Sequence, residues 1–241
     1  MQVLKTTKRL SKFLFFSFTL ISVSLFSCST VNNVSVNEYI YEIHFIDVGQ
    51  GDAILITTPG KILLVDGDPR NSGVTDYLDS LEIDQIDIVI GTHPHADHIG
   101  VLIQVFQDFD VGKVIDPGVS HTTITYNDYM YEINSSDITH TAGEKGMEWE
   151  LSEDAYMKII YPTSPSSSHL NNASIVARIT LDNVVVLLTG DVEQEGEEEM
   201  LGYPNLLASN IFKGRSSWKQ NQFHSRLLRC GYAGNKHNYV W

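Results

Sequence analysis

Cysteine and basic residues are scarce in this sequence, and each shortage argues against a class of protein. The 241 residues include two cysteines, Cys28 and Cys230, which is too few for a disulfide framework. Lysine and arginine number 16 against 30 acidic residues, and four of the 16 lie within the first 27 residues, which contain no acid. The remainder has 12 basic against 30 acidic residues, a formal charge of −18. A body this acidic has no broad basic face, which argues against tight, non-specific binding of nucleic acid.

The start of the chain has the pattern of an export signal. Residues 5–12 are basic, and residues 13–26 (FLFFSFTLISVSLF) are apolar and too short for a typical membrane-spanning helix. The following Leu25-Phe26-Ser27-Cys28 is similar to a bacterial lipobox, in which the cysteine is lipidated and becomes the new N-terminus. We therefore expect a lipoprotein signal peptide at 1–27 and a tether at 28–37. The protein is then exported and lipid-anchored on the outer face of the bacterial cytoplasmic membrane. A buried hydrophobic helix is the alternative.

Apolar patterning in the body predicts strands grouped in hairpins, with helices between the groups. No internal repeat or low-complexity block is present, and residues 119–150 are polar and weakly patterned, which predicts mainly loop and short helix. This grouping favours an α/β (α+β) fold of two sheets covered by helices over a simple parallel sheet. Strands are predicted at 39–46, 53–57, 61–65, 86–90, from 114, and at 156–161, 174–181 and 184–188; helices are predicted at 74–81 and 99–106.

A cluster of metal-ligand residues follows one short predicted strand. The stretch THPHADHIG (92–100) contains His93, His95, Asp97 and His98. Imidazole and carboxylate groups are the ligands that zinc and similar metals prefer. Alternate residues of an extended loop point the same way, so His93 and His95 are expected to bind one metal, while Asp97 and His98 turn toward a second. A solvated polar loop is the alternative, but three histidines and an aspartate so close together favour metal binding.

The pattern HxHxDH resembles the signature of the metallo-β-lactamase superfamily. The surrounding stretches are similar to one branch of it, the hydrolase domain of ComEC-type competence DNA-uptake proteins and their small stand-alone relatives. These stretches are FIDVGQGDAILI (45–56), KILLVDGD (61–68), NNASIVARI (171–179) and LLTGDVE (187–193). The resemblance implies a four-layer αββα sandwich over residues 38–213 and a site for two divalent metal ions, zinc or manganese.

The resemblance also implies roles for individual residues. The four residues of the HxHxDH loop are the second ligand motif of the superfamily, and Asp191 matches the aspartate that bridges both metals. Asp66 matches the aspartate that braces the ligand loop. Both Asp66 and Asp191 could instead be ordinary turn residues.

Four further residues match less specific parts of the pattern. Asp47 and Asp52 belong to the DVGQGD loop, whose glycines let the backbone pass close to the site, although both could be turn residues. The third motif of the wider superfamily is a histidine, and His169 lies in the matching region. The ComEC branch carries asparagine there, which makes Asn172 a supporting candidate and leaves His169 either a ligand or a surface histidine.

The implied chemistry is hydrolysis by a metal-bound hydroxide, with Asp97 orienting the water. The resemblance favours phosphodiester substrates, either small molecules or nucleic acid. Lactam, lactone and thioester hydrolysis use the same metal chemistry and remain alternatives. The membrane would be a partner through the lipid anchor at Cys28.

The chain departs from the family after Lys213. Relatives carry a pattern similar to Leu-Lys-Val-Gly-His-His-Gly-Ser-Lys-Thr-Ser-Ser, whereas this chain continues with GRSSWKQNQF (214–223) and no histidine pair. Reading the codons of residues 214–224 from their second base can encode the missing pattern, which suggests a one-base frameshift and an aberrant, poorly ordered tail at 214–241. The chain is then a truncated sandwich with doubtful metal occupancy. The alternative function is an inactive or non-catalytic surface lipoprotein.

Overall fold

The computed structural model describes residues 2–7, 40–49, 51–67, 73–215 and 239–240. Most of the predicted signal peptide, the lipidation site Cys28 and the tether at 28–37 lie outside the described residues, as do residues 216–238 of the tail. None of the helices in the described ranges has the length and apolar character needed to cross a membrane.

The first sheet has seven strands that follow one another in chain order across the sheet. Strands β1 to β4 are antiparallel to their neighbours, and β4 to β7 are parallel. β1 falls within the predicted signal peptide and pairs with β2, so removal of that peptide would make β2 the edge strand. The strands are β1 (Gln2–Thr7), β2 (Ile40–Phe45), β3 (Ile54–Thr57), β4 (Ile62–Val65), β5 (Gln85–Ile90), β6 (Asp110–Asp116) and β7 (Thr139–Ala142).

The second sheet has six strands, in the order β13-β12-β11-β10-β9-β8. Strands β8 to β11 form an antiparallel meander, and β12 and β13 add in parallel at the far edge. The strands are β8 (Glu148–Ser152), β9 (Ala155–Tyr161), β10 (Val176–Leu181), β11 (Val184–Leu188), β12 (Ile211–Lys213) and β13 (Tyr239–Val240).

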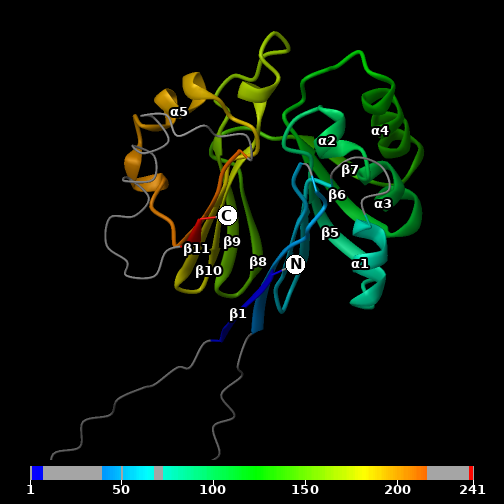
Figure 1. Cartoon of the computed structure of the whole chain (residues 1–241), viewed down its shortest axis with the longest axis horizontal. Coiled ribbons are helices and arrows are strands. Elements are labelled where there is room, and N and C mark those ends of the chain that lie inside the picture. Colours follow the sequence, from blue (N-terminus) through cyan, green and yellow to red (C-terminus); the bar gives the residue numbers. More distant parts are fainter. Residues whose placement is uncertain (1, 8–39, 50, 68–72, 216–238, 241) are drawn as a thin grey trace, which may run out of the picture.

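The two sheets face each other, and helices cover their outer sides (Figure 1). On the first sheet these helices are α1 (Val74–Ser80), α3 (Leu102–Asp108) and α4 (Ile124–Ser135), with the short α2 (Ala96–Ile99) near one end. The second sheet is covered by α5 (Gln194–Met200). The order of layers is therefore helix, sheet, sheet, helix, and the predicted four-layer sandwich is confirmed.

Alternation along the strands explains why the layers hold together. In β4, Leu63 and Val65 belong to the cluster between the two sheets, whereas Leu64 belongs to the cluster under the helices. Successive side chains of a strand point to opposite faces, so β4 contributes to both clusters. Burial of each such side chain contributes roughly 1.5–3 kcal/mol. A third cluster packs α5 on the outer face of the second sheet.

The expectation of mainly loop and short helix at 119–150 is wrong. The structure forms the 12-residue helix α4 there, followed by β7 and β8. The hydroxyl of Thr123 caps α4 by accepting a hydrogen bond from the Tyr126 amide. Tyr129 and Ile133, four residues apart, bury one face of the helix. The rest of α4 is polar, which is why its periodicity is weak.

The C-terminal segment also differs in part from expectation. Residues 239–240 form β13, paired in parallel with β12, so this part of the predicted aberrant tail belongs to the second sheet. Helix α5, which the sequence patterning did not indicate, is rich in glutamate and buries Gly196, Glu197 and Met200. Its apolar stripe is too narrow to give a clear helical pattern.

Candidate metal centre

The candidate site lies where loops from both sheets meet. The loop that holds His93 and His95 connects β5 to α2, and His98 lies on α2 itself. Asp191 follows β11 of the second sheet. Gly190, just before it, has φ +52°, and a Cβ atom there would lie 2.9 Å from Thr92, so glycine allows the two loops to approach. The site is thus assembled by contact between the sheets.

Asp66 holds the histidine loop in place through hydrogen bonds. Its carboxylate accepts hydrogen bonds from the backbone amide and the hydroxyl of Thr92, both at 2.7 Å. Its Oδ2 also lies 2.8 Å from Nδ1 of His98. Asp66 has φ +55°, a left-handed conformation that aspartate tolerates better than most residues. With Nδ1 held by Asp66, the Nε2 atom of His98 is left to face the site.

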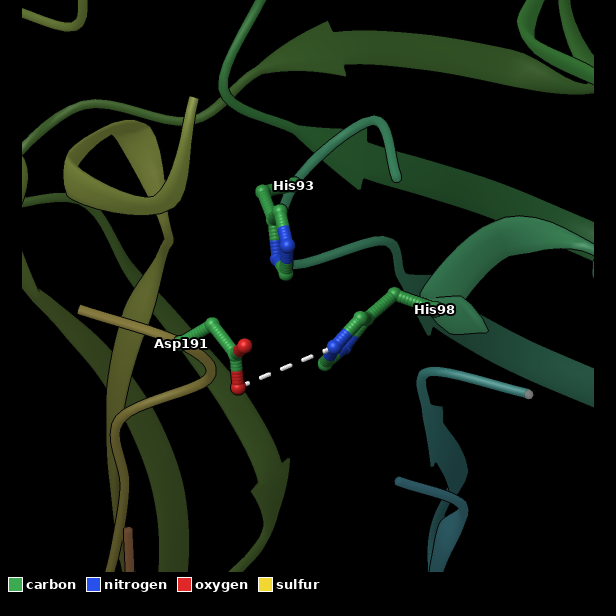
Figure 2. A group of neighbouring side chains, drawn as sticks. All are labelled: His93, His98 and Asp191. Atoms are coloured by element: carbon green, nitrogen blue, oxygen red, sulfur yellow. Dashed lines mark ion pairs between the residues drawn. The ribbon is translucent and has the colours of Figure 1, made fainter. Parts of the chain in front are cut away.

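His93, His98 and Asp191 point toward one another (Figure 2). One ligand atom from each of the three lies within 4.8 Å of the others. The His93 and His98 rings are 4.1 Å apart between centroids, and His98 Nε2 lies 3.7 Å from Asp191 Oδ1. His95 joins the group through its Nδ1, 2.9 Å from Nε2 of His93. His93 and His98, which the loop geometry predicts to bind different metals, therefore lie in one group.

Burial and charge prepare these histidines differently. Burial lowers the pKa of His93 well below its ordinary value of 6.5, and the neighbouring His98 and His95 lower it further. Burial also lowers the pKa of His95. For His98, burial is outweighed by the Asp66 carboxylate, which raises the pKa to about 9. These shifts favour the neutral, metal-binding form of His93 and His95, whereas the Asp66 carboxylate favours the protonated form of His98.

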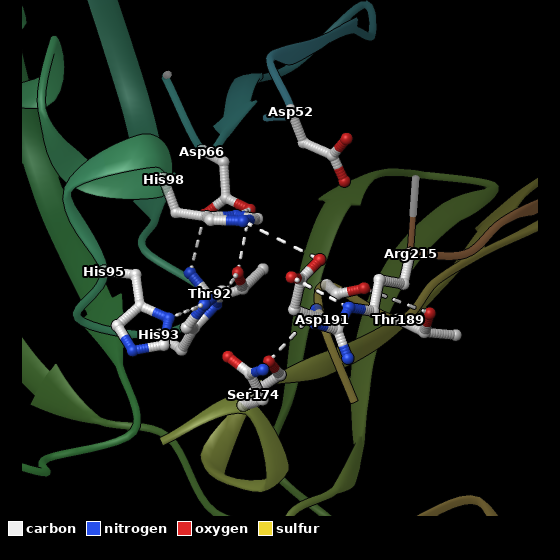
Figure 3. A network of polar contacts seen from close by, with 12 residues as sticks. Asp52, Asp66, Thr92, His93, His95, His98, Ser174, Thr189, Asp191 and Arg215 are labelled. Carbon is white, nitrogen blue, oxygen red and sulfur yellow. Dashed lines mark hydrogen bonds and ion pairs between the residues drawn. The ribbon is translucent and has the colours of Figure 1, made fainter. Parts of the chain in front are cut away.

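Asp191 is held from its backbone and flanked by a cation. Its amide donates a hydrogen bond to the Ser174 hydroxyl at 3.1 Å. Its second oxygen, Oδ2, lies 3.3 Å from Nε of Arg215, as Figure 3 shows. Burial raises the pKa of Asp191, and His98 and Arg215 oppose that rise.

A second anchor fixes the Arg215 guanidinium. Its Nη1 donates to Oε1 of Glu193 at 2.6 Å, and the amide of Asn171 donates to the same oxygen at 2.9 Å. The hydrogen bond from Asn171, together with Arg215, lowers the pKa of Glu193. Glu193 is therefore a charged acceptor that holds Arg215 beside Asp191.

A buried ion pair connects the DVGQGD loop to the second sheet. Lys213 Nζ on β12 lies 2.5 Å from Asp52 Oδ1, and it also donates to the Gly214 carbonyl at 3.0 Å. Asp52 is 6% exposed and Lys213 is 14% exposed, so each charge depends on the other. Asp52 therefore supports the site by linking the two sheets.

The other predicted residues lie further from the ligand group. Asp97 is exposed on α2 and raises the pKa of His95 against the effect of burial. Asp47 is exposed and accepts a hydrogen bond from the Gly49 amide, as a turn aspartate does. Asn172 accepts a hydrogen bond from the Glu193 amide at 2.8 Å, just before α5 begins. His169 is exposed and lines a cavity of about 360 Å³ with Asn172 and glutamates of the α5 region.

Several residues of the site carry no signal in the sequence. Thr92 and Ser174 belong to no ligand motif. Their roles come from hydrogen bonds that Thr92 makes with Asp66 and Ser174 makes with Asp191 in the folded chain. The ring of His121 lies edge-on to His95 at 5.8 Å, although no motif includes it. Arg215 was unexpected, because it lies in the segment with no clear patterning.

The donor set fits one divalent metal ion. Two imidazoles and a carboxylate, with His95 adjacent, are a suitable set for zinc or manganese. A second ion is not equally provided for by the described residues, because Asp97 lies outside the group of three and the guanidinium of Arg215 lies beside Asp191.

Comparison with known proteins agrees with this geometry. The sequence model of the metallo-β-lactamase superfamily matches residues 46–230, more than half of the chain. ComE operon protein 3 of Bacillus subtilis is 25% identical over 207 residues, 74% of this chain and 26% of that protein. Competence protein ComA of Neisseria gonorrhoeae is 24% identical over 159 residues, 65% of this chain and 20% of that protein.

A solved structure shares the fold at low identity. A mutant of a HARLDQ-motif metallo-β-lactamase from Cronobacter sakazakii superposes with a TM-score of 0.50 and 14% identity, covering 72% of this chain and 74% of that one. The chain spans about a quarter of the competence proteins that it matches, so the likeness concerns one part of them. From the match of the family model, supported by the layered fold, the chain belongs to the metallo-β-lactamase superfamily, whose members are generally hydrolases.

Proposed function

We propose that this chain is a metal-dependent hydrolase of phosphodiesters, in small molecules or in nucleic acid. The observation that carries the proposal is the convergence of His93, His98 and Asp191 from two sheets, with ligand atoms within 4.8 Å of one another. Such a convergence of imidazole and carboxylate groups from separate loops, with His98 oriented by Asp66, is typical of a metal site.

The residues divide the work between binding and positioning. His93, His98 and Asp191 would hold a divalent metal, which would supply Lewis acidity to activate water and polarise the scissile group. Asp66 fixes the ring of His98 so that Nε2 faces the site. For Asp97, which is exposed on α2 and raises the pKa of His95, we propose the role of orienting the attacking water. No serine or cysteine nucleophile is required.

Phosphodiesters are favoured by the relatives rather than by the geometry. One of the matching proteins is named as a competence protein, which suggests nucleic acid or its fragments as substrate. The acidic composition argues for short or weakly bound substrates, since a long duplex would be repelled. Lactams, lactones and thioesters remain the alternative substrates of the same chemistry.

A substrate panel tests the proposal. The purified full chain is assayed with bis-p-nitrophenyl phosphate, nitrocefin and a thioester, each with Mn²⁺ or Zn²⁺ added. We expect turnover of the phosphodiester. Substitution of His93 by alanine should abolish that turnover, and so should removal of the metal by a chelator. Turnover of nitrocefin alone would replace the phosphodiester with a lactam, and no turnover with any substrate would reject the hydrolase.

A non-catalytic surface protein is the second candidate, favoured by Arg215 beside Asp191. Resequencing the gene around the codon of Lys213 tests the frameshift hypothesis directly. A protein with the frame restored after Lys213 would be assayed beside the chain as printed. Activity confined to the restored protein would make the printed chain the non-catalytic form.

We further propose that the protein is exported and anchored through a lipid on Cys28. The support is the basic and then apolar sequence of residues 5–26, followed by the lipobox-like Leu25-Phe26-Ser27-Cys28. Expression in bacteria with radiolabelled palmitate should label the protein, and Cys28→Ala should abolish the label. Unlabelled protein in the cytosolic fraction would refute the anchor.

A further inference from the structure

The two carboxylate oxygens of Asp191 face different cations. Oδ1 faces His98 Nε2 at 3.7 Å, on the side of the ligand group. Oδ2 faces the guanidinium of Arg215, with Nε at 3.3 Å (Figure 3). The guanidinium therefore lies against the Asp191 oxygen that points away from His98, where it occupies space that a second ion bound to Asp191 would need.

Arg215 is held in this position by more than one contact. Glu193 accepts from its Nη1 at 2.6 Å, and Asn171 donates to the same oxygen of Glu193 at 2.9 Å. The arginine side chain is 27% exposed, so it borders the site while still reaching solvent. A guanidinium is planar and permanently charged, which suits it to pair with a carboxylate and an anionic ligand together.

Cations already accompany the carboxylates around the site. Lys213 pairs with Asp52. His98 contacts both Asp66 and Asp191. Arg215 is shared between Asp191 and Glu193. A single divalent ion held by His93, His98 and Asp191 leaves the contacts of Lys213 and Arg215 in place. A second ion would have to displace Arg215 from Asp191, against the repulsion of like charges.

We propose that this chain binds one divalent metal, through His93, His98 and Asp191, and that Arg215 takes the place of a second cation and binds an anionic oxygen of the ligand. The identity of that ligand as a phosphodiester rests on the proposed function. The count of metal ions and the role of Arg215 do not.

The test counts manganese and measures the binding of inorganic phosphate. Mn²⁺ is chosen because thiolates bind it poorly, which limits binding at cysteines outside the site. Free Mn²⁺ is followed by electron paramagnetic resonance during titration of the full chain, Arg215→Gln, Arg215→Lys and the control Lys158→Gln. Lys158 pairs with Glu148 at 3.4 Å on the second sheet and is no part of the site. Phosphate binding to the manganese-loaded proteins is measured by calorimetry.

We expect one Mn²⁺ per native chain when free metal is tenfold above its Kd. Arg215→Gln should bind that ion about tenfold more tightly at low salt, because a positive charge next to Asp191 is removed. Its affinity for phosphate should fall about tenfold, while Arg215→Lys, which keeps the charge but loses the planar set of donors, should fall by less. Lys158→Gln should change neither value.

Two results would overturn the proposal. A native chain that binds two ions with similar affinity leaves no place for Arg215 as the second cation, and this count holds even if a variant does not fold. Unchanged manganese and phosphate affinity in a folded Arg215→Gln, as judged by circular dichroism, would make the arginine a surface contact. Absence of turnover with every substrate would reject the proposed hydrolase and leave both measurements valid.

Discussion

Replacement of Glu197 by glutamine should stabilise the protein at neutral and alkaline pH. Glu197 lies on α5 with 3% of its surface exposed, and its Oε2 has no hydrogen-bond partner among the described residues. Burial, with a smaller effect from Glu198, raises its pKa from the ordinary 4.5 to about 7. The folded state therefore binds the proton more tightly than the unfolded state. The contribution of Glu197 to the free energy of unfolding is therefore fully present below pH 4.5 and is lost as the pH rises through 7.

The size of the effect follows from the shift. At about 1.4 kcal/mol per pKa unit, the ionised carboxylate costs roughly 3 kcal/mol of folding free energy above pH 7. Glu197→Gln keeps the shape without the charge, so its advantage over the native protein should grow from near zero at pH 4.5 to about 3 kcal/mol at pH 8.5. Urea denaturation at several pH values measures it, with exposed Glu144→Gln as control. A difference that stays constant with pH would show that this carboxylate ionises normally and refute the reasoning.

Three further outcomes are expected. Asp66→Asn should weaken manganese or zinc binding about 10–100-fold by equilibrium dialysis, because the carboxylate no longer orients His98; unchanged affinity would remove Asp66 from its bracing role. Metal at 100 times its Kd should stabilise the chain by about 2.7 kcal/mol in a thermal melt, and His93→Ala should abolish the shift; a shift that persists would place the metal elsewhere. Asp52→Ala should cost about 3–5 kcal/mol in urea denaturation because it leaves the Lys213 ammonium buried and unpaired, and adding Lys213→Met should recover part of that loss; no recovery would show that the pair is not coupled.

The histidine loop and Asp191 could be predicted because their chemistry is local. His93, His95 and His98 stand together after an apolar run, and the spacing itself indicates ligands. Asp191 lies far away in sequence but follows an apolar strand at the place where the family carries its bridging aspartate. Most strands of the body, and the arrangement of two sheets covered by helices, followed from apolar patterning, which the two clusters on either side of the first sheet reproduce. The four-layer order was implied by the family resemblance.

Other parts of the site depend on contacts that no local pattern encodes. Arg215 contacts Asp191 because β12 pairs in parallel with β11, so that the residues after Lys213 lie beside those that follow β11. The ion pair of Lys213 with Asp52 joins residues 161 positions apart. Helix α4 was missed because Tyr129 and Ile133 are its only fully buried side chains, and a stripe this narrow hardly differs from a loop.

The meeting of ligands from both sheets has a consequence for the life of the protein in a cell. His93 and His98 belong to one half of the sandwich and Asp191 to the other, so an ion bound between them fastens the halves together. Loss of the ion would remove this link and leave others near that end, among them hydrophobic packing, the Lys213–Asp52 pair and the hydrogen bond that the Ile175 amide donates to the Thr92 carbonyl. Proteases act on transiently opened forms, and these would be more populated without the metal. Scarcity of metal would therefore shorten the lifetime of the protein as well as lower its activity. Its abundance would then follow the supply of metal around it.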